Sequence, residues 1–358
     1  MKPLNRLLSK VLSPLKKVQF HLEQKRLAAY IIATNNQKRA FLFGSPRHSD
    51  MGDQAQTYCI QRWINKNYRQ HHVIIFHQSN VTDQMITVLR KNIRPDDMIF
   101  FHSGYHLTDL YPVRKAYCKV ASEFSDHKIV VFPQTVNFVT DKDIEKEVAD
   151  TFNNHCNITL LCRDELSYST AQSLFHRCKL HLYPDIVTSL IGTRYDDNAS
   201  KNGILFCMRK DKEAFYSVDE KNNFYKRFDI FNTTLIDTTI STSYKKIKKN
   251  REVILKNMLD TFAQHKLVIT DRYHGTIFSL ITNTPVIVIA STDHKLSSGV
   301  KWFPESFRKY VSFAKDLDSA YNKAIEILSR TEIIPPLPDY FEQRYYSKLK
   351  VLLENEIM

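Results

Sequence analysis

Arg272 and His274 are the residues whose types and spacing best suit acid–base chemistry on an anionic substrate. They stand in the segment TDRYHG, between an apolar run at Leu267–Ile269 and a helical pattern at Thr276–Ile281. A guanidinium is a permanent cation that matches carboxylates and phosphates, and an imidazole titrates near neutrality. Open α/β sheets bind ligands at the carboxyl ends of their strands, so this segment predicts a site for an anionic substrate that needs a proton transfer. The structural alternative is that Asp271 pairs with Arg272 and His274 caps the helix.

Two further arginines follow predicted strands and are candidates to bind the same substrate. Arg163 comes directly after the apolar run ITLLC, and Arg209 follows the run GILFCM. Guanidinium groups together could hold a small acid that carries both a carboxylate and a phosphate. For Arg163, an ion pair with Asp164 or Glu165 is the alternative explanation.

Two aspartates are candidates for a base that activates an acceptor hydroxyl. Asp53 opens a predicted helix directly after Gly52, and Asp185 follows a strand that ends at Tyr183. The structural alternatives are helix capping for Asp53 and turn formation for Asp185.

Glycine and histidine mark the remaining loops of the predicted site. The chain has only seven glycines, and Gly52 and Gly104 lie just beyond predicted strands, where the backbone can approach a ligand. His102 and His106 flank Gly104. Their spacing lacks the HExxH pattern and no further ligands accompany them, so we predict no metal site.

Strands alternate with helices along the chain, which predicts parallel, doubly wound sheets. The polar segment 192–203 suggests a linker between two domains. The predicted parts are a basic N-terminal segment (1–37), an N-terminal domain (38–191), a C-terminal domain (203–332) and a C-terminal helix (333–358). The expected strands cover 39–43, 73–76, 97–102, 128–132, 158–162, 180–183, 203–208, part of 229–237, 267–269, 286–289 and 309–313. The expected helices cover 54–65, 85–91, 112–124, 141–152, 166–175, 244–264, 276–281, 315–330 and 340–355.

Composition narrows the class of protein. Hydrophobic residues make up 43% of the 358 residues, and no apolar run approaches the roughly 18–20 residues that span a bilayer. The six cysteines are scattered without a CxxC pair, which favours reduced thiols in a cytosolic protein. The phosphate-binding GxxxxGK[ST], the dinucleotide-binding GxGxxG and the hydrolase GxSxG motifs are absent, which disfavours those three chemistries.

The net charge of +13 is concentrated in two segments. Residues 1–30 hold seven Lys and Arg against Glu23 alone, and residues 244–256 hold six against Glu252. Such patches indicate contact with an anionic surface rather than a nucleic-acid-binding protein. In residues 1–30 the apolar and basic positions have helical spacing, interrupted by Pro14, as in a helix lying on anionic lipid head groups. Packing of this helix on the chain's own surface is the alternative.

The order of several short motifs resembles the polysaccharide pyruvyl transferase family. The segments MGDQA, FHSGYHLTD, FPQT, CRDELS, LYPDIV and TDRYHG occur in the family's order between about residues 40 and 305, with the strand-end Arg209 before the last. The chain departs from the family at His102–Gly104, where a glycine-rich turn is usual, and at Pro133–Thr135, where PQS is usual. Both departures lie in the first half, the side expected to bind the acceptor.

The resemblance implies an α/β fold with two Rossmann-like domains that face each other across a cleft, as in GT-B glycosyltransferases. It implies transfer of the pyruvyl unit of phosphoenolpyruvate onto a hexose of a cell-surface polysaccharide precursor, as a cyclic ketal. Arg163 and Arg272, with Arg209, would then bind the donor, and His274 would be the acid/base. Phosphoenolpyruvate is a co-substrate, and no cofactor or metal is required. The acceptor side would comprise Asp53, Asp185, Gly52, His102, Gly104 and His106.

The expected partners are phosphoenolpyruvate, a lipid-linked or polymeric glycan, and an anionic membrane surface contacted by residues 1–30. These partners predict a cytoplasmic enzyme, peripheral at the inner face of the cell membrane. One alternative is a GT-B glycosyltransferase with a nucleotide-sugar donor, although the TDRYHG region offers no clear residue for the ribose. The other is a non-catalytic, membrane-associated subunit of a polysaccharide assembly, in which residues 1–30 and 244–256 are the functional parts.

Overall fold

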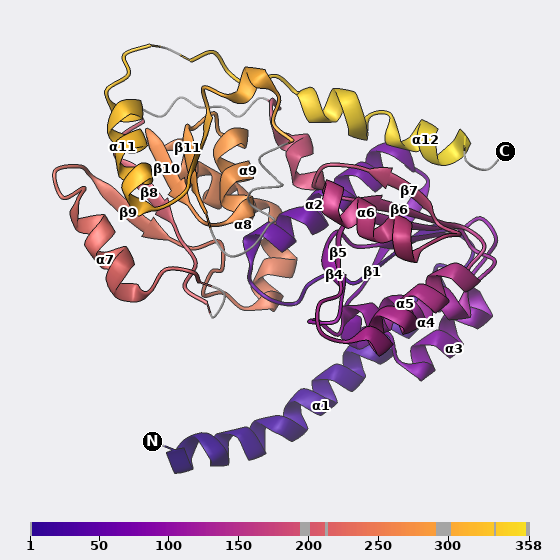
Figure 1. Ribbon diagram of the computed structural model, residues 1–358. Coiled ribbons are helices and arrows are strands. Elements are labelled where there is room, and N and C mark those ends of the chain that lie inside the picture. Colours follow the sequence, from indigo (N-terminus) through magenta and orange to yellow (C-terminus); the bar gives the residue numbers. More distant parts are fainter. Residues whose placement is uncertain (1, 194–200, 212–213, 291–301, 333, 356–358) are drawn as a thin grey trace.

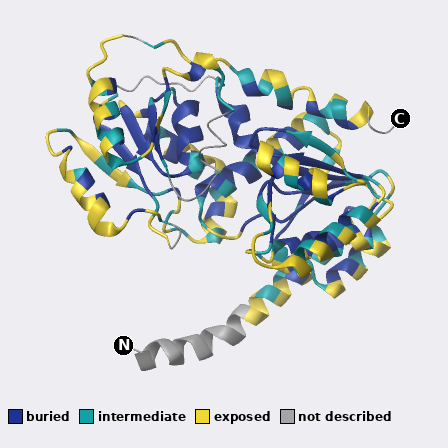
Figure 2. Cartoon of the chain, in the orientation of Figure 1, coloured by how far each residue is buried: buried dark blue, intermediate teal, exposed yellow. Residues whose placement is uncertain are grey.

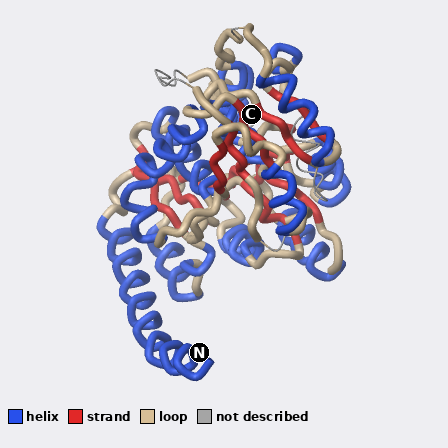
Figure 3. Tube along the Cα trace, turned by 90° about the vertical axis from the view of Figure 1, so that its left-hand side faces the viewer, coloured by secondary structure: helices blue, strands red, loops and turns tan. Residues whose placement is uncertain are grey.

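Two parallel β-sheets, each covered by helices, make up the chain (Figure 1, Figure 3). The computed structural model describes residues 2–193, 201–211, 214–290, 302–332 and 334–355. Short apolar runs form most of the strands because both faces of each sheet are covered. Figure 2 shows the buried residues concentrated in the two sheets and in the helices between them.

The first sheet has seven parallel strands in the order β2-β1-β3-β5-β6-β7, with β4 paired to β5. The order reverses at β1, whose neighbours β2 and β3 both follow it in the chain. A reversal of this kind leaves a crevice at the carboxyl ends of the strands. The strands are β1 (Lys38–Phe43), β2 (His71–Phe76), β3 (Met98–Phe101), β4 (Gly104–Thr108), β5 (Ile129–Asn137), β6 (Ile158–Cys162) and β7 (Lys179–Leu182).

The second sheet has five parallel strands in the order β12-β11-β10-β8-β9. Its order reverses between β8 and β10, so the segments that follow these two strands lie at the second crevice. The strands are β8 (Ile204–Cys207), β9 (Thr233–Ile236), β10 (Leu267–Thr270), β11 (Val286–Ile289) and β12 (Val311–Ala314).

Four helical elements lie between the sheets and join the two halves. These are α2 (Met51–Asn67), η2 (Ile186–Leu190), α8 (Tyr244–Ala263) and α9 (Tyr273–Ile281), whose apolar side chains form one core with residues of both sheets. Because α2 packs on α8 and η2 packs on α9, this layer sets the spacing of the two crevices. The outer helices are α3 (Asp83–Asn92), α4 (Val113–Glu123), α5 (Lys142–Asn154), α6 (Glu165–Leu174), α7 (Val218–Lys226) and α11 (Leu317–Leu328).

Two segments expected to be loops are strands. Residues 104–108 form β4, and Pro133–Thr135 lie inside β5 rather than in a turn, so both predictions are wrong. The ladder between β5 and β6 shifts register between Val131 and Gln134. Proline has no N–H to donate to a neighbouring strand, which accounts for the irregularity at Pro133.

Two helices also differ from the expectation. Helix α9 begins at Tyr273, three residues before the predicted start, which places His274 in its first turn rather than in a loop. Helix α7 was not predicted, although Ser217 and Glu220 form a capping box at its start. That box is a sequence-level signal for a helix N-terminus.

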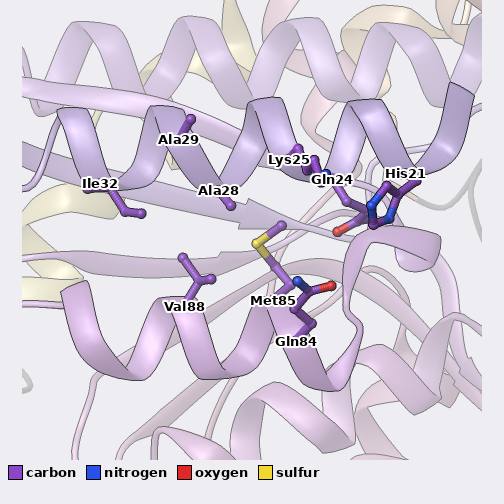
Figure 4. Close-up of a pocket in the computed structure, with 9 residues that line it drawn as sticks. All are labelled: His21, Gln24, Lys25, Ala28, Ala29, Ile32, Gln84, Met85 and Val88. Atoms are coloured by element: carbon purple, nitrogen blue, oxygen red, sulfur yellow. The ribbon is translucent and has the colours of Figure 1, made fainter. Parts of the chain in front are cut away.

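Helix α1 (Lys2–Ala33) runs without a break through Pro14. Its C-terminal half packs on α3 across a groove of about 250 Å³, and its N-terminal half extends away from the body (Figure 1). The alternative that this helix packs on the chain's own surface therefore holds for its C-terminal half. Residues that face each other across the groove include Gln24 and Ala28 of α1 and Met85 and Val88 of α3 (Figure 4).

A buried arginine ties the end of α1 to the first sheet. The side chain of Arg39 in β1 is fully buried, pairs with Asp97 and donates to the carbonyl of Ile31 over 2.9 Å. Burial of this charge is tolerated because its N–H groups have acceptors.

The C-terminal segment returns to the first half of the chain. Trp63 Nε1 in α2 donates to the carbonyl of Tyr346 over 2.9 Å, and α12 (Leu349–Asn355) follows. The predicted helix 340–355 is thus split into a π-helical turn at Glu342–Tyr346 and a short α-helix. Within the described ranges, no helix has the length and apolar character needed to cross a bilayer. All six cysteines are free thiols.

Candidate active site

A cavity of about 440 Å³ opens between the two halves, and side chains that follow β1, β6, β8 and β10 line it. Its position agrees with the expectation that ligands bind beyond the carboxyl ends of the strands. Six of the ten predicted site residues line it: Asp53, His106, Arg163, Arg209, Arg272 and His274. Other lining residues are His48, Asp50, Gln78, Tyr105, Tyr111, Asp211 and Tyr273.

His274 reaches the cavity from the first turn of α9. Its Nε2 lies 3.6 Å from Oδ2 of Asp185, a distance longer than a hydrogen bond, and 12% of its side chain is exposed. Burial by itself would lower the pKa of His274, but the carboxylate of Asp185, with those of Asp53 and Asp50, raises it above the ordinary value. The imidazole is therefore held toward its protonated form.

Asp185 lies behind His274 and does not face the cavity. Its side chain is fully buried, and it accepts hydrogen bonds from Gln56 Nε2 (2.6 Å) and from the backbone N–H of Val187 (3.0 Å). Burial raises the pKa of Asp185, yet His274 and Arg163 (Nη1 3.7 Å away) bring it below the usual value. The carboxylate is fully buried and does not line the cavity, so the structure does not support the predicted contact with an acceptor hydroxyl, which stays a prediction. Asp185 is a buried neighbour of the His274 imidazole.

Arg163 lines the cavity on the side of the first sheet. Its Nε donates to Oγ1 of Thr135, its guanidinium lies 5.7 Å from the ring centre of Tyr273, and its carbonyl accepts from Trp302 Nε1 over 2.7 Å. The alternative pairing with Asp164 is not formed, since Asp164 caps α6 by accepting from the N–H of Ser167. Arg163 thus lies beside His274 and Asp185, as a donor-binding residue would.

Arg272 is surrounded by carboxylates. Asp237 accepts from its Nε and Nη2 over 2.8 Å each, Asp211 lies 2.8 Å from Nη2, and Asp50 lies 3.9 Å from Nη1. Burial lowers the pKa of Arg272, but these three carboxylates raise it above the ordinary value. The charge of Arg272 is therefore balanced by the protein, which the sequence did not predict.

Asp271, the alternative partner considered for Arg272, binds the backbone of Arg209 instead. Oδ1 of Asp271 accepts from the backbone N–H of Arg209 over 2.8 Å, and Arg209 Nη1 lies 3.3 Å from Asp211. The alternative in which Asp271 pairs with Arg272 and His274 caps the helix is not observed, because Arg272 is the N-cap residue and no side chain caps α9.

Asp50 and Asp53 flank the start of α2. Asp50 is the N-cap: its Oδ1 accepts from the N–H of Gly52 over 2.8 Å, so the capping role considered for Asp53 belongs to Asp50. Oδ2 of Asp50 also accepts from the hydroxyls of Thr238 and Thr239, 3.1 Å each, across the cleft. Asp53 is 35% exposed and lies 3.3 Å from His48 Nε2. Burial, and then the charge of Asp50, raises the pKa of Asp53.

Asp50, Asp53 and His274 each offer one ligand atom, and these atoms lie within 4.8 Å of one another. This group could hold a divalent cation. However, Asp50 already accepts hydrogen bonds on both oxygens, and a protonated imidazole cannot bind a metal. The absence of a metal stays a prediction.

Gly52 and His102 have other roles than the predicted contacts to an acceptor. A methyl carbon on Gly52 would lie 2.1 Å from Nδ1 of His274, so the imidazole occupies the space that a side chain would need. His102 is fully buried, with its ring nitrogens 2.8 Å from Thr57 Oγ1 and 2.6 Å from the carbonyl of Ser103. Burial lowers its pKa to about 3, and His102 does not line the cavity, so its predicted acceptor contact stays a prediction that the structure does not support.

Gly104 and His106 lie together at the edge of the cavity. Gly104 is buried and has φ +136°, a conformation that favours glycine, and a methyl carbon there would lie 3.3 Å from Nε2 of His106. His106 lines the cavity and its Nδ1 lies 2.8 Å from the hydroxyl of Tyr117. The lack of a side chain at Gly104 therefore leaves room for the ring of His106.

The predicted set missed three aspartates of the site. Asp50 stands in SPRHSDMGD, before a glycine and a helix, which is the pattern of an N-cap. Asp237 directly follows β9, at the same sheet edge as Arg209 and Arg272. The strand-end rule that selected the arginines applies to Asp237 as well. Asp211 has no comparable signal, since only its contacts with the two arginines identify it.

The chain is similar to known proteins in sequence and in fold. The chain is 32% identical over 286 residues to General stress protein 30 of Bacillus subtilis, a match that covers 76% of this chain and 80% of that protein. It is 23% identical over 268 residues to Pyruvyl transferase 1 of Schizosaccharomyces pombe, covering 71% and 67%. The structure of UDP-GlcNAc 2-epimerase from Methanocaldococcus jannaschii superposes with a TM-score of 0.52 at 12% identity, over 89% of this chain and 99% of that one.

The structural similarity concerns the fold alone and confirms two Rossmann-like domains that face each other across a cleft. The family model described as polysaccharide pyruvyl transferase matches residues 51–294, from the start of α2 to beyond β11. That range includes Asp53, Arg163, Arg209, Arg272 and His274. The chain therefore belongs to the polysaccharide pyruvyl transferase family and is a polysaccharide pyruvyltransferase.

Proposed function

We propose that this enzyme transfers the pyruvyl unit of phosphoenolpyruvate onto a hexose of a cell-surface polysaccharide precursor, as a cyclic ketal. The observation that carries the proposal is the position of His274. Its imidazole, with a raised pKa, lines the same cavity as Arg163 and Arg209. A proton donor beside guanidinium groups is what an anionic enol phosphate needs.

In the proposed reaction His274 donates a proton to the methylene carbon of the donor, which becomes the methyl group. The neighbouring carbon gains oxocarbenium character, and one sugar hydroxyl attacks it as that hydroxyl loses its proton. The C–O bond to phosphate breaks, and inorganic phosphate leaves with the proton taken from the first hydroxyl. A second hydroxyl adds to the same carbon to close the ring and returns its proton to His274. The carboxylate of Asp185 lies on the Nε2 side of the imidazolium and stabilises its charge. Nδ1 lies against Gly52, at the start of α2.

Arg163 and Arg209 are the proposed partners of the donor's carboxylate and phosphate. Arg272 also lines the cavity, but Asp237 and Asp211 occupy its Nε and Nη2, so its contact with the donor would come from Nη1, which lies 3.9 Å from Asp50. Asp53 is the proposed base for the acceptor hydroxyl, because it is a partly exposed carboxylate that lines the same cavity as His274 and its raised pKa suits proton uptake.

The proposed acceptor is a lipid-linked or polymeric glycan, reached at the cytoplasmic face of the membrane. Support comes from α1, whose N-terminal half extends from the body and whose first 30 residues carry seven cations against Glu23. Anionic lipids attract such segments by about 1 kcal/mol per cation near the surface.

The test is an assay of phosphoenolpyruvate-dependent ketal formation on a panel of hexosides, with product mass and linkage determined. We expect a mass gain of one pyruvyl ketal and release of one phosphate per transfer. His274→Ala should lower turnover about 10²–10⁴-fold, the range of general acid–base catalysis, without loss of fold. Consumption of a nucleotide sugar with no ketal product on any hexoside would replace the proposal with a glycosyltransferase activity.

A further inference from the structure

A second cavity, of about 530 Å³, continues the active-site cavity toward α1 and the start of α8. The two cavities share His48, Gln78, His106 and Val113, so a ligand at His274 can extend from one into the other. We call the second one the outer cavity. Its size falls in the range of small-ligand pockets, roughly 300–1,000 Å³.

The outer cavity differs from the inner one in charge. Several aspartates line the inner cavity, whereas no Asp or Glu is among the described residues that line the outer cavity. Arg47 lines it, and 37% of the Arg47 side chain is exposed. Uncharged donors complete its wall: the amide of Gln78 and the hydroxyl of Ser79, 3.5 Å from Arg47 Nη1.

A hydrogen bond between Tyr244, the first residue of α8, and His77 places the start of α8 next to this cavity. His77 in the wall accepts from the Tyr244 hydroxyl at Nε2 (2.7 Å) and donates from Nδ1 to the carbonyl of Ser45 (2.8 Å). Burial is the main reason that the pKa of His77 falls to about 4, and the cations Arg47, Lys248 and Arg251 lower it further. Of these cations, Arg47 also lines the outer cavity.

One exposed carboxylate opposes these cations. Glu23 of α1 pairs with Arg47 over 2.8 Å, with 34% of its side chain exposed. An exposed ion pair of this kind contributes little, about 0–1 kcal/mol. A phosphate carries more charge and accepts two hydrogen bonds from one guanidinium, so it should displace Glu23.

We propose that the outer cavity binds a phosphate or diphosphate group of the acceptor, which places the sugar at His274. This inference rests on the proposed function, because it assigns the acceptor's chemical class to the same site. Arg47 contacts the phosphate oxygens, and Ser79 and Gln78 donate to them.

The first experiment measures transfer to two acceptors that differ only in charge: a hexosyl diphosphate and the methyl hexoside. Arg47→Gln should raise KM for the diphosphate about tenfold, as for loss of a charge-assisted hydrogen bond, with kcat unchanged. KM for the methyl hexoside and for phosphoenolpyruvate should not change. Glu23→Gln should lower KM for the diphosphate. Lys266→Gln, an exposed lysine at the amino end of β10, removes the same charge far from the cavity and should have no effect.

The second experiment separates failure of this inference from failure of the proposed function. Binding of inorganic diphosphate to the full chain is measured calorimetrically with phosphoenolpyruvate present, so transfer is not required. Saturable binding that Arg47→Gln weakens supports the inference even where no ketal forms. Diphosphate binding that Arg47→Gln does not weaken overturns it. Loss of retention on phosphatidylglycerol vesicles in Arg47→Gln, without loss of diphosphate binding, would also overturn it and assign this cation to lipid head groups.

Discussion

Gly52 at the start of α2 and His274 at the start of α9 touch so closely that a methyl group on Gly52 would lie 2.1 Å from Nδ1 and 2.4 Å from Cγ of the imidazole. The two residues are on opposite halves of the chain, so the close packing of the halves decides where the imidazole lies. The lack of a side chain at Gly52, in MGDQA, therefore leaves the space that the imidazole of His274, in TDRYHG, occupies.

Gly52→Ala should displace His274 and lower turnover by about 10²-fold, since small displacements of a catalytic group have effects of this size. It should also cost about 1–3 kcal/mol of unfolding free energy through overpacking. Both quantities can be measured by steady-state kinetics and urea unfolding. In a His274→Gly background the added methyl group has room, so the stability cost should disappear. An equal cost in both backgrounds would contradict the contact.

Asp185→Asn should shift the pH dependence of turnover. His274 must be protonated to act as the acid, so turnover falls as pH rises through its raised pKa. Without the Asp185 carboxylate, burial dominates and lowers that pKa, and the alkaline limb of the profile moves to lower pH, by about 1 unit or more. Asp150→Asn on the outer helix α5 removes the same charge and should leave the profile in place. An unshifted limb in Asp185→Asn would show that Asp185 does not raise the pKa of His274.

The interaction of His274 with Asp185 should also make the free energy of unfolding depend on pH. His274 has a folded-state pKa above its ordinary value, so its contribution is fully present below pH 6.5 and is lost as pH rises through the folded-state pKa. The difference in unfolding free energy between the wild type and His274→Asn should therefore shrink as pH rises. A difference that grows with pH would contradict the sign of the shift.

Asp211→Asn should strengthen donor binding. Asp211 lies against both Arg209 and Arg272, where it would compete with the proposed anionic donor. Its removal should lower the Kd for phosphoenolpyruvate severalfold, on the scale of a partly exposed ion pair. Calorimetry measures this directly, and Asp219→Asn on α7 is the control of equal charge. Weaker binding in Asp211→Asn would show that Asp211 supports the arginines instead of competing for them.

Arg39→Met should destabilise the chain by about 3–5 kcal/mol, because it leaves Asp97 charged and without its partner in the interior. Arg39→Met/Asp97→Leu removes both charges and should recover much of that loss. Urea unfolding of the two variants gives the comparison. The activity of the folded fraction should be retained, since Arg39 lies at the amino end of β1, away from the cavity.

The strands, their parallel arrangement and the strand-end position of Arg163, Arg209 and Arg272 could be predicted from the sequence, because apolar periodicity and turn residues act over a few positions. Local patterns failed where neighbouring strands decided the structure, as at Gly104–Thr108, which becomes a strand by pairing with β5. The start of α9 at Tyr273 was missed for a similar reason, since no side chain caps that helix.

The sequence by itself determined the types of groups that meet at the strand ends: guanidinium, imidazole and carboxylate. Only the tertiary structure decided their relations. It places Asp185 next to Nε2 of His274 and Gly52 next to Nδ1 of the same ring. It also places three aspartates around Arg272. The reason is that these groups lie on segments far apart in the chain, and the packing of α2 and η2 on α8 and α9 brings them within a few ångströms.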